Sequence, residues 1–215
     1  MKVYGISGLG ADMRVFNFLK LDYSITPIEW IEPRKKETLY DYSIRLSNKI
    51  DTKSKFILLG VSFGGIVATE ISKQLKPTLT ILISSAEKES EIRPIFRFIA
   101  KIGLLRILPS TCFRPPKFIA HYLFGTKNKK LLNEIIKDTD LKFTKWAVIQ
   151  LTIWNNQKTV RNIIRIHGTN DKLIPLKSLN DGELIEKGEH FMIVDRANEI
   201  SNIINKKIKT LYNNG

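Results

Sequence analysis

The first ninety residues of the chain alternate between two patterns of hydrophobic and polar positions. Short apolar runs rich in β-branched residues predict strands, and stretches with an apolar residue every three or four positions predict helices. We expect strands at residues 2–6, 24–30, 55–60 and 79–84. Helices are expected at residues 37–50 and 66–75. Strands that alternate with helices favour right-handed crossovers and a mostly parallel sheet covered on both faces.

The same alternation returns near the end of the chain, after a middle segment of a different kind. Strands are predicted at residues 162–168 and 183–187, followed by an amphipathic helix at 196–212. Residues 93–154 contain no convincing strand, and helices are predicted there between four breaking residues, Pro109, Pro115, Pro116 and Gly125. Helices inserted between two parts of one sheet would cover its carboxyl edge, where open α/β sheets bind ligands.

These patterns predict an α/β protein with a single domain over residues 1–215. The core would comprise residues 1–90 and 160–215 and contain about six strands, with a helical cap inserted at about residues 91–159. A chain of 215 residues and 24.7 kDa is long enough for one proper core. Hydrophobic residues at 43% and charged residues at 26% are typical of globular proteins and exclude a disordered chain.

The sequence favours a cytoplasmic protein. The N-terminal stretch MKVYGISGLGAD has no apolar run of signal-peptide length, and no later window has the roughly 18 apolar residues of a membrane span. Cys112 is the single cysteine, so no internal disulfide can form. We expect Cys112 to be a buried or half-buried thiol, because no plausible base flanks it.

The formal net charge of +14 is concentrated in one segment. Residues 97–130 contain no Asp or Glu, and eight basic residues fall there, namely Arg97, Lys101, Arg106, Arg114, Lys117, Lys127, Lys129 and Lys130. The simplest interpretation is a solvated basic face. A transient contact with an anionic membrane or attraction of an anionic substrate is the alternative, whereas nucleic-acid binding is not favoured.

A serine between glycines follows the strongest strand pattern of the chain. The stretch Gly60-Val61-Ser62-Phe63-Gly64 fits G-x-S-x-G, in which a sharp strand-to-helix turn exposes a serine hydroxyl. A serine hydroxyl is a poor nucleophile at neutral pH, so Ser62 needs a base and the base needs an orienting carboxylate. In this arrangement the chain order is serine, acid, histidine.

Two later residues satisfy that order. Asp171 lies in the loop after the predicted strand at 162–168, and His190 is the only histidine beyond it. Both would emerge at the same edge of the sheet as Ser62. Two other acids compete for the role of Asp171: Asp181 is less well placed, and Asp195 follows the histidine.

An oxyanion formed at the substrate carbonyl needs two backbone N–H donors. The N–H of Phe63, directly after Ser62 at the start of a helix, is the first candidate. The N–H of Leu9, in the glycine-containing loop after the first strand, is the second. In the same loop, Asp12 and Arg14 are expected to form a salt bridge or a helix cap rather than to touch substrate.

Four stretches in this order, GISGLGADMRVF, GVSFGG, HGTNDKLIP and GEHF, resemble the α/β-hydrolase superfamily. The resemblance covers about residues 1–86 and 160–212, and it implies that the sheet lacks the usual antiparallel first hairpin. Many relatives have His-Gly where this chain has Ser7-Gly8. His167 is expected to be a hydrogen-bonded residue beneath the acid loop, and no partner is predicted for His121.

These observations predict a serine hydrolase that cleaves a small carboxylic ester or thioester through an acyl-enzyme intermediate, with no metal or organic cofactor. The simplest interpretation of the apolar faces of the cap is that they pack on the sheet. The alternative is that they line an acyl pocket, with the residues Phe96, Phe98, Leu104, Leu105, Ile107 and Phe113. The alternatives are a carbon–carbon bond hydrolase or acyl transferase of the same fold, and a non-catalytic binder of anionic lipid or nucleic acid. The acyl length, the leaving group and the oligomeric state stay open.

Overall fold

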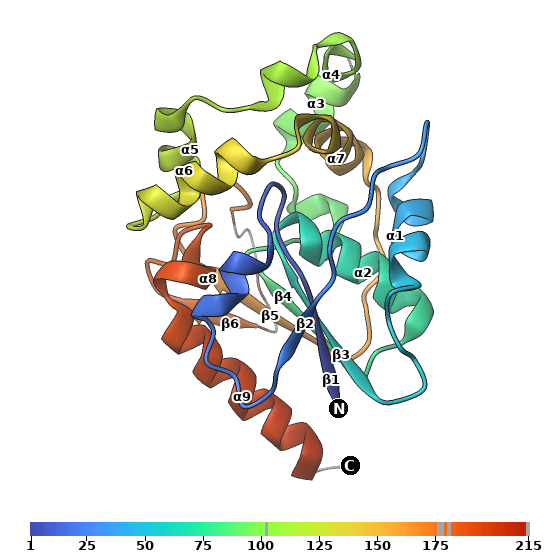
Figure 1. The fold of residues 1–215 in the computed structure, drawn as a ribbon, viewed down its shortest axis with the longest axis vertical. Coiled ribbons are helices and arrows are strands. Elements are labelled where there is room, and N and C mark those ends of the chain that lie inside the picture. Colours follow the sequence, from blue (N-terminus) through green and yellow to red (C-terminus); the bar gives the residue numbers. More distant parts are fainter. Residues whose placement is uncertain (102, 176–178, 180–181, 214–215) are drawn as a thin grey trace.

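The protein, analysed as a computed structural model, is built around one parallel sheet (Figure 1). The structure describes residues 1–101, 103–175, 179 and 182–213, with the backbone only for Arg97, Ala100, Lys101 and Tyr212. The sheet order is β2-β1-β3-β4-β5-β6. The strands are β1 (Lys2–Ile6), β2 (Ile25–Pro27), β3 (Phe56–Val61), β4 (Leu79–Ile83), β5 (Ile163–Gly168) and β6 (Glu183–Ile185). Every neighbouring pair is parallel, which confirms the expected sheet without an antiparallel hairpin.

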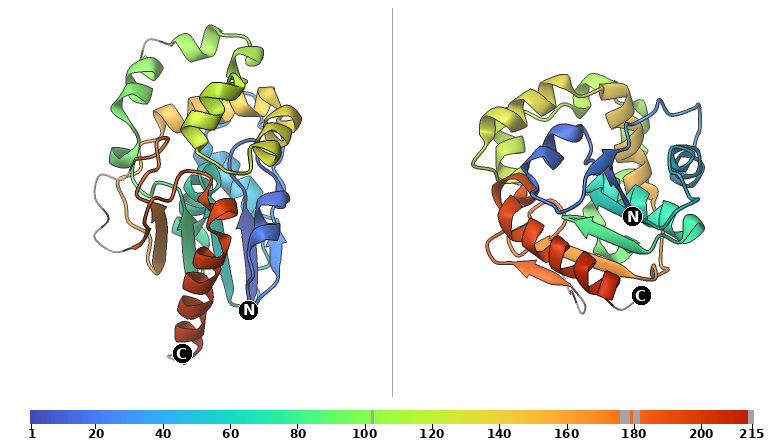
Figure 2. Two further views of the ribbon diagram at one scale, coloured as in Figure 1. Left: turned by 90° about the vertical axis from the view of Figure 1, so that its left-hand side faces the viewer. Right: turned by 60° about the horizontal axis from the view of Figure 1, so that its bottom comes forward.

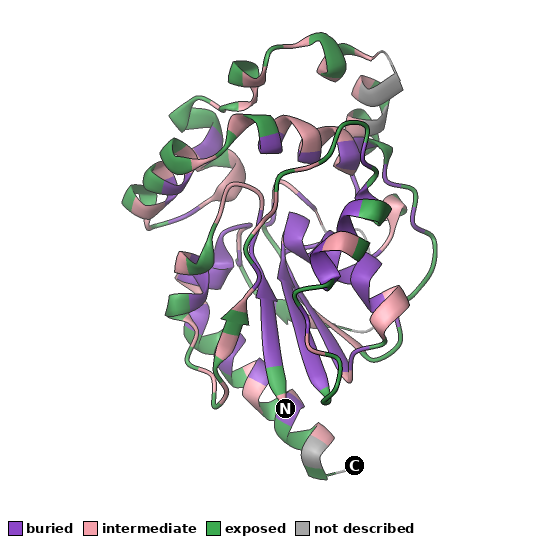
Figure 3. Ribbon diagram, turned by 45° about the vertical axis from the view of Figure 1, so that its right-hand side comes forward, coloured by how far each residue is buried: buried purple, intermediate pink, exposed green. Residues whose placement is uncertain are grey.

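The central strands are the most buried part of the molecule, as Figure 3 shows by their colour. Every residue of β3 and β4 is buried, which is why their sequences are nearly continuous apolar runs. Alternate residues of β3 serve opposite faces, because Leu58 belongs to one core cluster while Ile57 and Leu59 belong to the other. The edge strands β2 and β6 are shorter and partly exposed.

Helices cover both faces of the sheet (Figures 1 and 2). On one face lie α1 (Leu39–Ser47) and α2 (Phe63–Leu75). On the other lie the 3₁₀ helix η1 (Met13–Phe18), α8 (Met192–Asp195) and α9 (Ala197–Asn213). Ile200, Ile204 and Ile208 recur every fourth residue along α9 and are buried against the strands, as the amphipathic pattern predicts.

The chain between β4 and β5 forms a helical insertion above the carboxyl ends of the strands (Figure 1). Its elements are η2 (Glu89–Glu91), α3 (Pro94–Lys101), α4 (Leu104–Ile107), η3 (Ser110–Phe113), α5 (Lys117–Phe124), α6 (Lys129–Asp138) and α7 (Leu141–Ile153). The breaks follow local chemistry: Pro109 and Pro116 directly precede η3 and α5, and Gly125 ends α5 with φ +55°. No helix in the described ranges is long and apolar enough to cross a membrane.

Helix α7 anchors the helical insertion to the core on one face of the sheet. Phe143 and Trp146 of α7 pack in an aromatic cluster with Trp30, Tyr42 and Phe63, with ring centroids as close as 4.5 Å for Tyr42 and Trp146. In the middle of the insertion, η3 has no buried residue. The expectation for Cys112 is therefore wrong: its side chain is exposed, because this short turn lies on the outside of the molecule.

Candidate active site

Ser62 occupies the sharp turn between β3 and α2. Its φ of 52° and ψ of −122° lie in a region that few residues other than glycine adopt. Its N–H donates to the carbonyl of Ile83 at 2.9 Å, and its carbonyl accepts from the Ser85 hydroxyl at 2.6 Å. A Cβ at Gly64 would collide with the carbonyl oxygens of Ser7 and Ile6. The turn therefore requires a glycine two residues after the serine.

The structure brings Ser62, His190 and Asp171 into one hydrogen-bonded chain. The hydroxyl of Ser62 lies 2.8 Å from Nε2 of His190, and Nδ1 of His190 lies 2.8 Å from Oδ2 of Asp171. The three residues follow β3, β5 and β6, so they meet at the carboxyl edge of the sheet as the sequence predicts. Asp171 and His190 are almost fully buried, which keeps their mutual hydrogen bond away from water.

The loop around Asp171 holds its carboxylate in one orientation. Oδ1 accepts the N–H groups of Leu173 and Ile174, each at 2.9 Å, which leaves Oδ2 for His190. Burial raises the pKa of Asp171, but attraction to His190 and the hydrogen bonds from His190 and Ile174 outweigh it. The pKa of the carboxyl group lies below its ordinary value, so Asp171 is ionised at neutral pH.

His167 supports this loop from below, as expected from its place in the sequence. Its Nε2 lies 2.8 Å from the carbonyl of Ile174 and 3.5 Å from Oδ2 of Asp171. Burial lowers the pKa of His167, against the attraction of Asp171. The ring is therefore neutral, and since a carbonyl only accepts, Nε2 carries the proton.

The other acids and histidine considered for the site have other partners or lie outside the described residues. Asp195 accepts the N–H of Lys127 at 3.0 Å, and Asp181 is outside the described residues. His121 is bonded to the Asn133 side chain at 2.9 Å within the helical insertion. Asp12 caps η1 and pairs with Arg14, which also reaches Asp138, so the expected salt bridge and helix cap are both present.

Solved structures of several esterases and related proteins superpose on this fold. A lipase-esterase related protein from Clostridium acetobutylicum superposes with a TM-score of 0.70 at 16% identity over 95% of this chain and 93% of its own. An esterase from Exiguobacterium antarcticum gives a TM-score of 0.71 at 14% identity over 97% and 92%. ClbQ from the colibactin NRPS/PKS pathway gives 0.66 at 15% identity over 100% and 99%. The chain has the α/β-hydrolase fold. By sequence it matches no protein-family model and no curated protein significantly.

In this α/β-hydrolase fold, the loop after β1 runs directly beside the serine. A Cβ at Gly8 would lie 3.3 Å from Cβ of Ser62, and Leu9 lines the same cavity as Ser62. Ser7 donates its hydroxyl to the carbonyl of Ala11 at 2.7 Å and so closes the loop on itself. Phe63 is the first residue of α2, and the first amides of a helix have no intrahelical acceptor.

A cavity of about 40 Å³ adjoins Ser62 and His190. The helical insertion contributes Phe124 of α5, Leu132, Ile135 and Ile136 of α6, and Thr139. None of the six apolar residues suggested for an acyl pocket lines it, so this cavity does not support that alternative. Phe98, Leu104 and Ile107 are instead exposed, because α3 and α4 turn these side chains outward. Helical spacing identifies an apolar face but does not say which way that face points.

Two residues of the helical insertion contact the site and were missed in the sequence. The ring of Phe124 meets the ring of His190 edge to face, with centroids 5.5 Å apart, and its carbonyl accepts the N–H of Phe191 at 2.9 Å. The hydroxyl of Thr139 lies 3.2 Å from the carbonyl of Gly10, in the loop after β1. Neither residue is near Ser62 in the sequence or belongs to a motif, so only the fold could reveal them.

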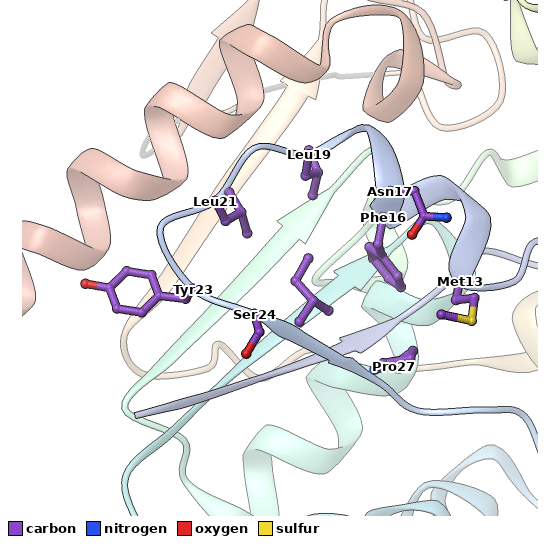
Figure 4. A pocket seen from close by; sticks show the side chains of 9 residues that line it. Met13, Phe16, Asn17, Leu19, Leu21, Tyr23, Ser24 and Pro27 are labelled. Carbon is purple, nitrogen blue, oxygen red and sulfur yellow. The ribbon is translucent and has the colours of Figure 1, made fainter.

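A larger cavity of about 260 Å³ lies between η1 and β2 (Figure 4). Its lining is mostly apolar and contains no carboxylate and no imidazole, and it shares no residue with the cavity beside Ser62. In the described ranges, no three His, Cys, Asp or Glu side chains are grouped so that they could hold a metal ion.

Proposed function

We propose that the protein is a serine hydrolase that cleaves a small carboxylic ester or thioester. The observation that carries this proposal is the continuous chain of hydrogen bonds from Ser62 through His190 to Asp171. Each member is oriented by the next, which is what an activated serine requires. Structural neighbours described as esterases and lipases are consistent with an ester substrate.

In this mechanism, Nε2 of His190 accepts the hydroxyl proton as Oγ of Ser62 bonds to the carbonyl carbon. The ionised Asp171 stabilises the imidazolium that results. The N–H groups of Leu9 and Phe63 donate to the oxyanion of the tetrahedral intermediate. When the carbon–oxygen or carbon–sulfur bond breaks, His190 returns the proton to the leaving group. In the second half of the reaction, His190 takes a proton from water as the water attacks the acyl-enzyme. His190 then returns this proton to Oγ of Ser62 as the carboxylic acid leaves.

The cavity beside Ser62 favours a short acyl group. Its volume of about 40 Å³ is only a few times the roughly 10–15 Å³ that a cavity needs to hold one water molecule. An acetyl methyl group fits such a space, whereas a long acyl chain requires the helices above it to move. We propose that residues of about 91–159 act as the cap that sets this limit.

The proposal is tested by hydrolysis of p-nitrophenyl esters of increasing acyl length. The wild type is expected to be most active on the shortest esters. Ser62→Ala should lower kcat/KM on the order of 10⁴-fold or more while the far-ultraviolet circular dichroism stays unchanged. Ser54→Ala, which changes an exposed serine on a loop, is the matched control and should keep full activity.

Equal activity of Ser62→Ala and the wild type would refute the serine mechanism. Two related reactions use the same groups, namely carbon–carbon bond hydrolysis and acyl transfer to an acceptor other than water. Cleavage of a β-diketone would identify the carbon–carbon bond hydrolase. Formation of a new ester when an alcohol is added to the ester assay would identify the acyl transferase. A non-catalytic binder would show no turnover in any of these assays.

A further inference from the structure

The outer surface of the helical insertion carries an unusual number of exposed apolar side chains. Among the described residues, thirteen large hydrophobic side chains are exposed, and seven of them lie between residues 95 and 122. These seven, Ile95, Phe98, Leu104, Ile107, Phe118, Ile119 and Tyr122, are called the outer apolar set below. Single exposed apolar residues are normal on a protein surface, but such a concentration in one segment is not.

The exposed residues are arranged by helix geometry. Ile95 and Phe98 lie three positions apart on α3, Leu104 and Ile107 three apart on α4, and Phe118 and Tyr122 four apart on α5. At these spacings the two side chains of each pair share one face of their helix. Three successive helices thus turn an apolar face to solvent, which is the reverse of a helix that packs on a core.

Exposure is highest in the middle of this surface. Ile107 is 81% exposed and Phe118 is 73% exposed. They belong to α4 and α5 of the helical insertion, much of which Figure 3 shows as exposed. These side chains do not pack into the core clusters of the protein.

Basic residues surround the outer apolar set. Arg106, Arg114 and Lys117 are exposed between its members, and Lys127, Lys129 and Lys130 are exposed just beyond them. No acidic residue occurs from residue 97 to residue 130. Apolar side chains among positive charges match the surface of an anionic bilayer. Its headgroups attract Lys and Arg, and its acyl region accepts Ile and Phe.

From this surface we infer that the helical insertion docks on anionic membranes. A second copy of the chain is a poorer occupant, because two such surfaces face to face would bring like charges together without any acidic partner. A nucleic acid would engage Arg106, Arg114 and Lys117 but leave Leu104 and Ile107 exposed, since phosphates bind cations and not aliphatic groups. Of these three occupants, only a bilayer uses both kinds of side chain.

The inference is tested by sedimentation of the full chain with vesicles, without any substrate. Vesicles of phosphatidylcholine containing phosphatidylglycerol should bind the protein at low salt, and vesicles of phosphatidylcholine alone should not. Binding should weaken as salt rises, because the ions screen the headgroup charge. The Ser62→Ala variant should bind like the wild type, so this outcome is independent of the proposed hydrolysis.

Two sets of variants assign the binding to this surface. The double variant Ile107→Asn and Phe118→Asn should reduce vesicle binding roughly tenfold or more. Tyr40→Asn, at a side chain 52% exposed on α1, is the matched control and should bind normally. Replacing Arg106, Arg114 and Lys117 by Gln should weaken binding roughly fivefold per charge. As a control, the same amount of charge is removed elsewhere by replacing Lys35, Lys206 and Lys209 by Gln. This variant should lose far less of the vesicle binding.

Three results would overturn the inference. The first is a lack of binding to anionic vesicles at low salt. The second is equal binding by the wild type and the double variant at Ile107 and Phe118. The third is a concentration-dependent dimer in analytical ultracentrifugation that the double variant abolishes, because the outer apolar set would then be a subunit interface.

Discussion

Single residues at the site hold conformations that the surrounding backbone enforces. Ser62 keeps a positive φ because its N–H and carbonyl are both bonded to the neighbouring strand β4 and the residues that follow it. Such a conformation is typically sustained only where neighbours over-determine it, and it is commonest at functional sites. The sequence motif indicates the turn, but the contacts of Ile83 and Ser85 that stabilise it come from a different part of the chain.

The neutral ring of His167 makes the stability of the protein depend on pH. Burial holds the pKa of His167 below its ordinary value of 6.5. In the range from about pH 6.5 down to the folded pKa, the unfolded chain binds a proton at this residue that the folded protein does not. The free energy of unfolding should therefore fall as the pH decreases through that range, and the full contribution is present above it.

His167→Gln removes this titration and retains an N–H donor for the Ile174 carbonyl. Urea unfolding at about pH 7.5 and about pH 5.5 should show a smaller loss of stability in the variant than in the wild type. His121→Gln, at the histidine bonded to Asn133, is the control and should follow the wild type. An identical loss in His167→Gln and the wild type would contradict a neutral buried ring.

At the scale of elements, α6 sets the space available beside Ser62. Leu132 and Ile135 are buried on the face of α6 that closes the cavity, and Thr139 joins the end of that helix to the loop after β1. Apart from Phe124 of α5, the rest of the cavity wall comes from the core of the fold. Changes in α6 should therefore alter the size of the accepted acyl group without changing the chemistry at Ser62.

Ile135→Ala is the sharpest test of this wall. The variant removes three carbon atoms from the cavity lining, so the most active p-nitrophenyl ester should have an acyl chain about two or three carbons longer. A loss of about 2–5 kcal/mol in the free energy of unfolding is expected as well. The control, Ile200→Ala in α9, should lose a similar amount of stability and keep the wild-type acyl preference. If both variants show the same change in acyl preference, α6 has no specific role in setting it.

The sheet could be predicted from the sequence because the pattern that indicates each strand lies within a few consecutive residues. Each strand is an apolar run of limited length, and Asp171 and His190 follow two of those runs in the order that a serine turn requires. The helical insertion could not be predicted to the same depth. Its helices are amphipathic with either face available, so the outward turn of Phe98 and Ile107 and the inward turn of Phe124 depend on tertiary contacts.

The whole molecule combines a largely buried candidate site with a strongly positive exterior. The net charge is +14, and the segment richest in basic residues belongs to the insertion above Ser62. A positive field around an opening raises the local concentration of anions. It acts over about one Debye length, roughly 10 Å in 0.1 M salt, so it should weaken quickly as salt is added.

This field predicts a preference for negatively charged substrates at low salt. An acetate ester of a carboxylated phenol should show a lower KM than the uncharged ester of the same size, by a few-fold at low ionic strength. The difference should shrink as salt is raised, while the KM of the uncharged ester changes little. If the ratio of the two KM values does not change with salt, the surface charge does not affect substrate binding at the site.

The position of Cys112 has a practical consequence. It is the only thiol of the chain, it is exposed, and it lies in η3 between α4 and α5. A maleimide dye should therefore attach at one known point without any engineered cysteine. Because that point is flanked by Ile107 and Phe118, the colour of an environment-sensitive dye would report in real time whether this side of the protein leaves water.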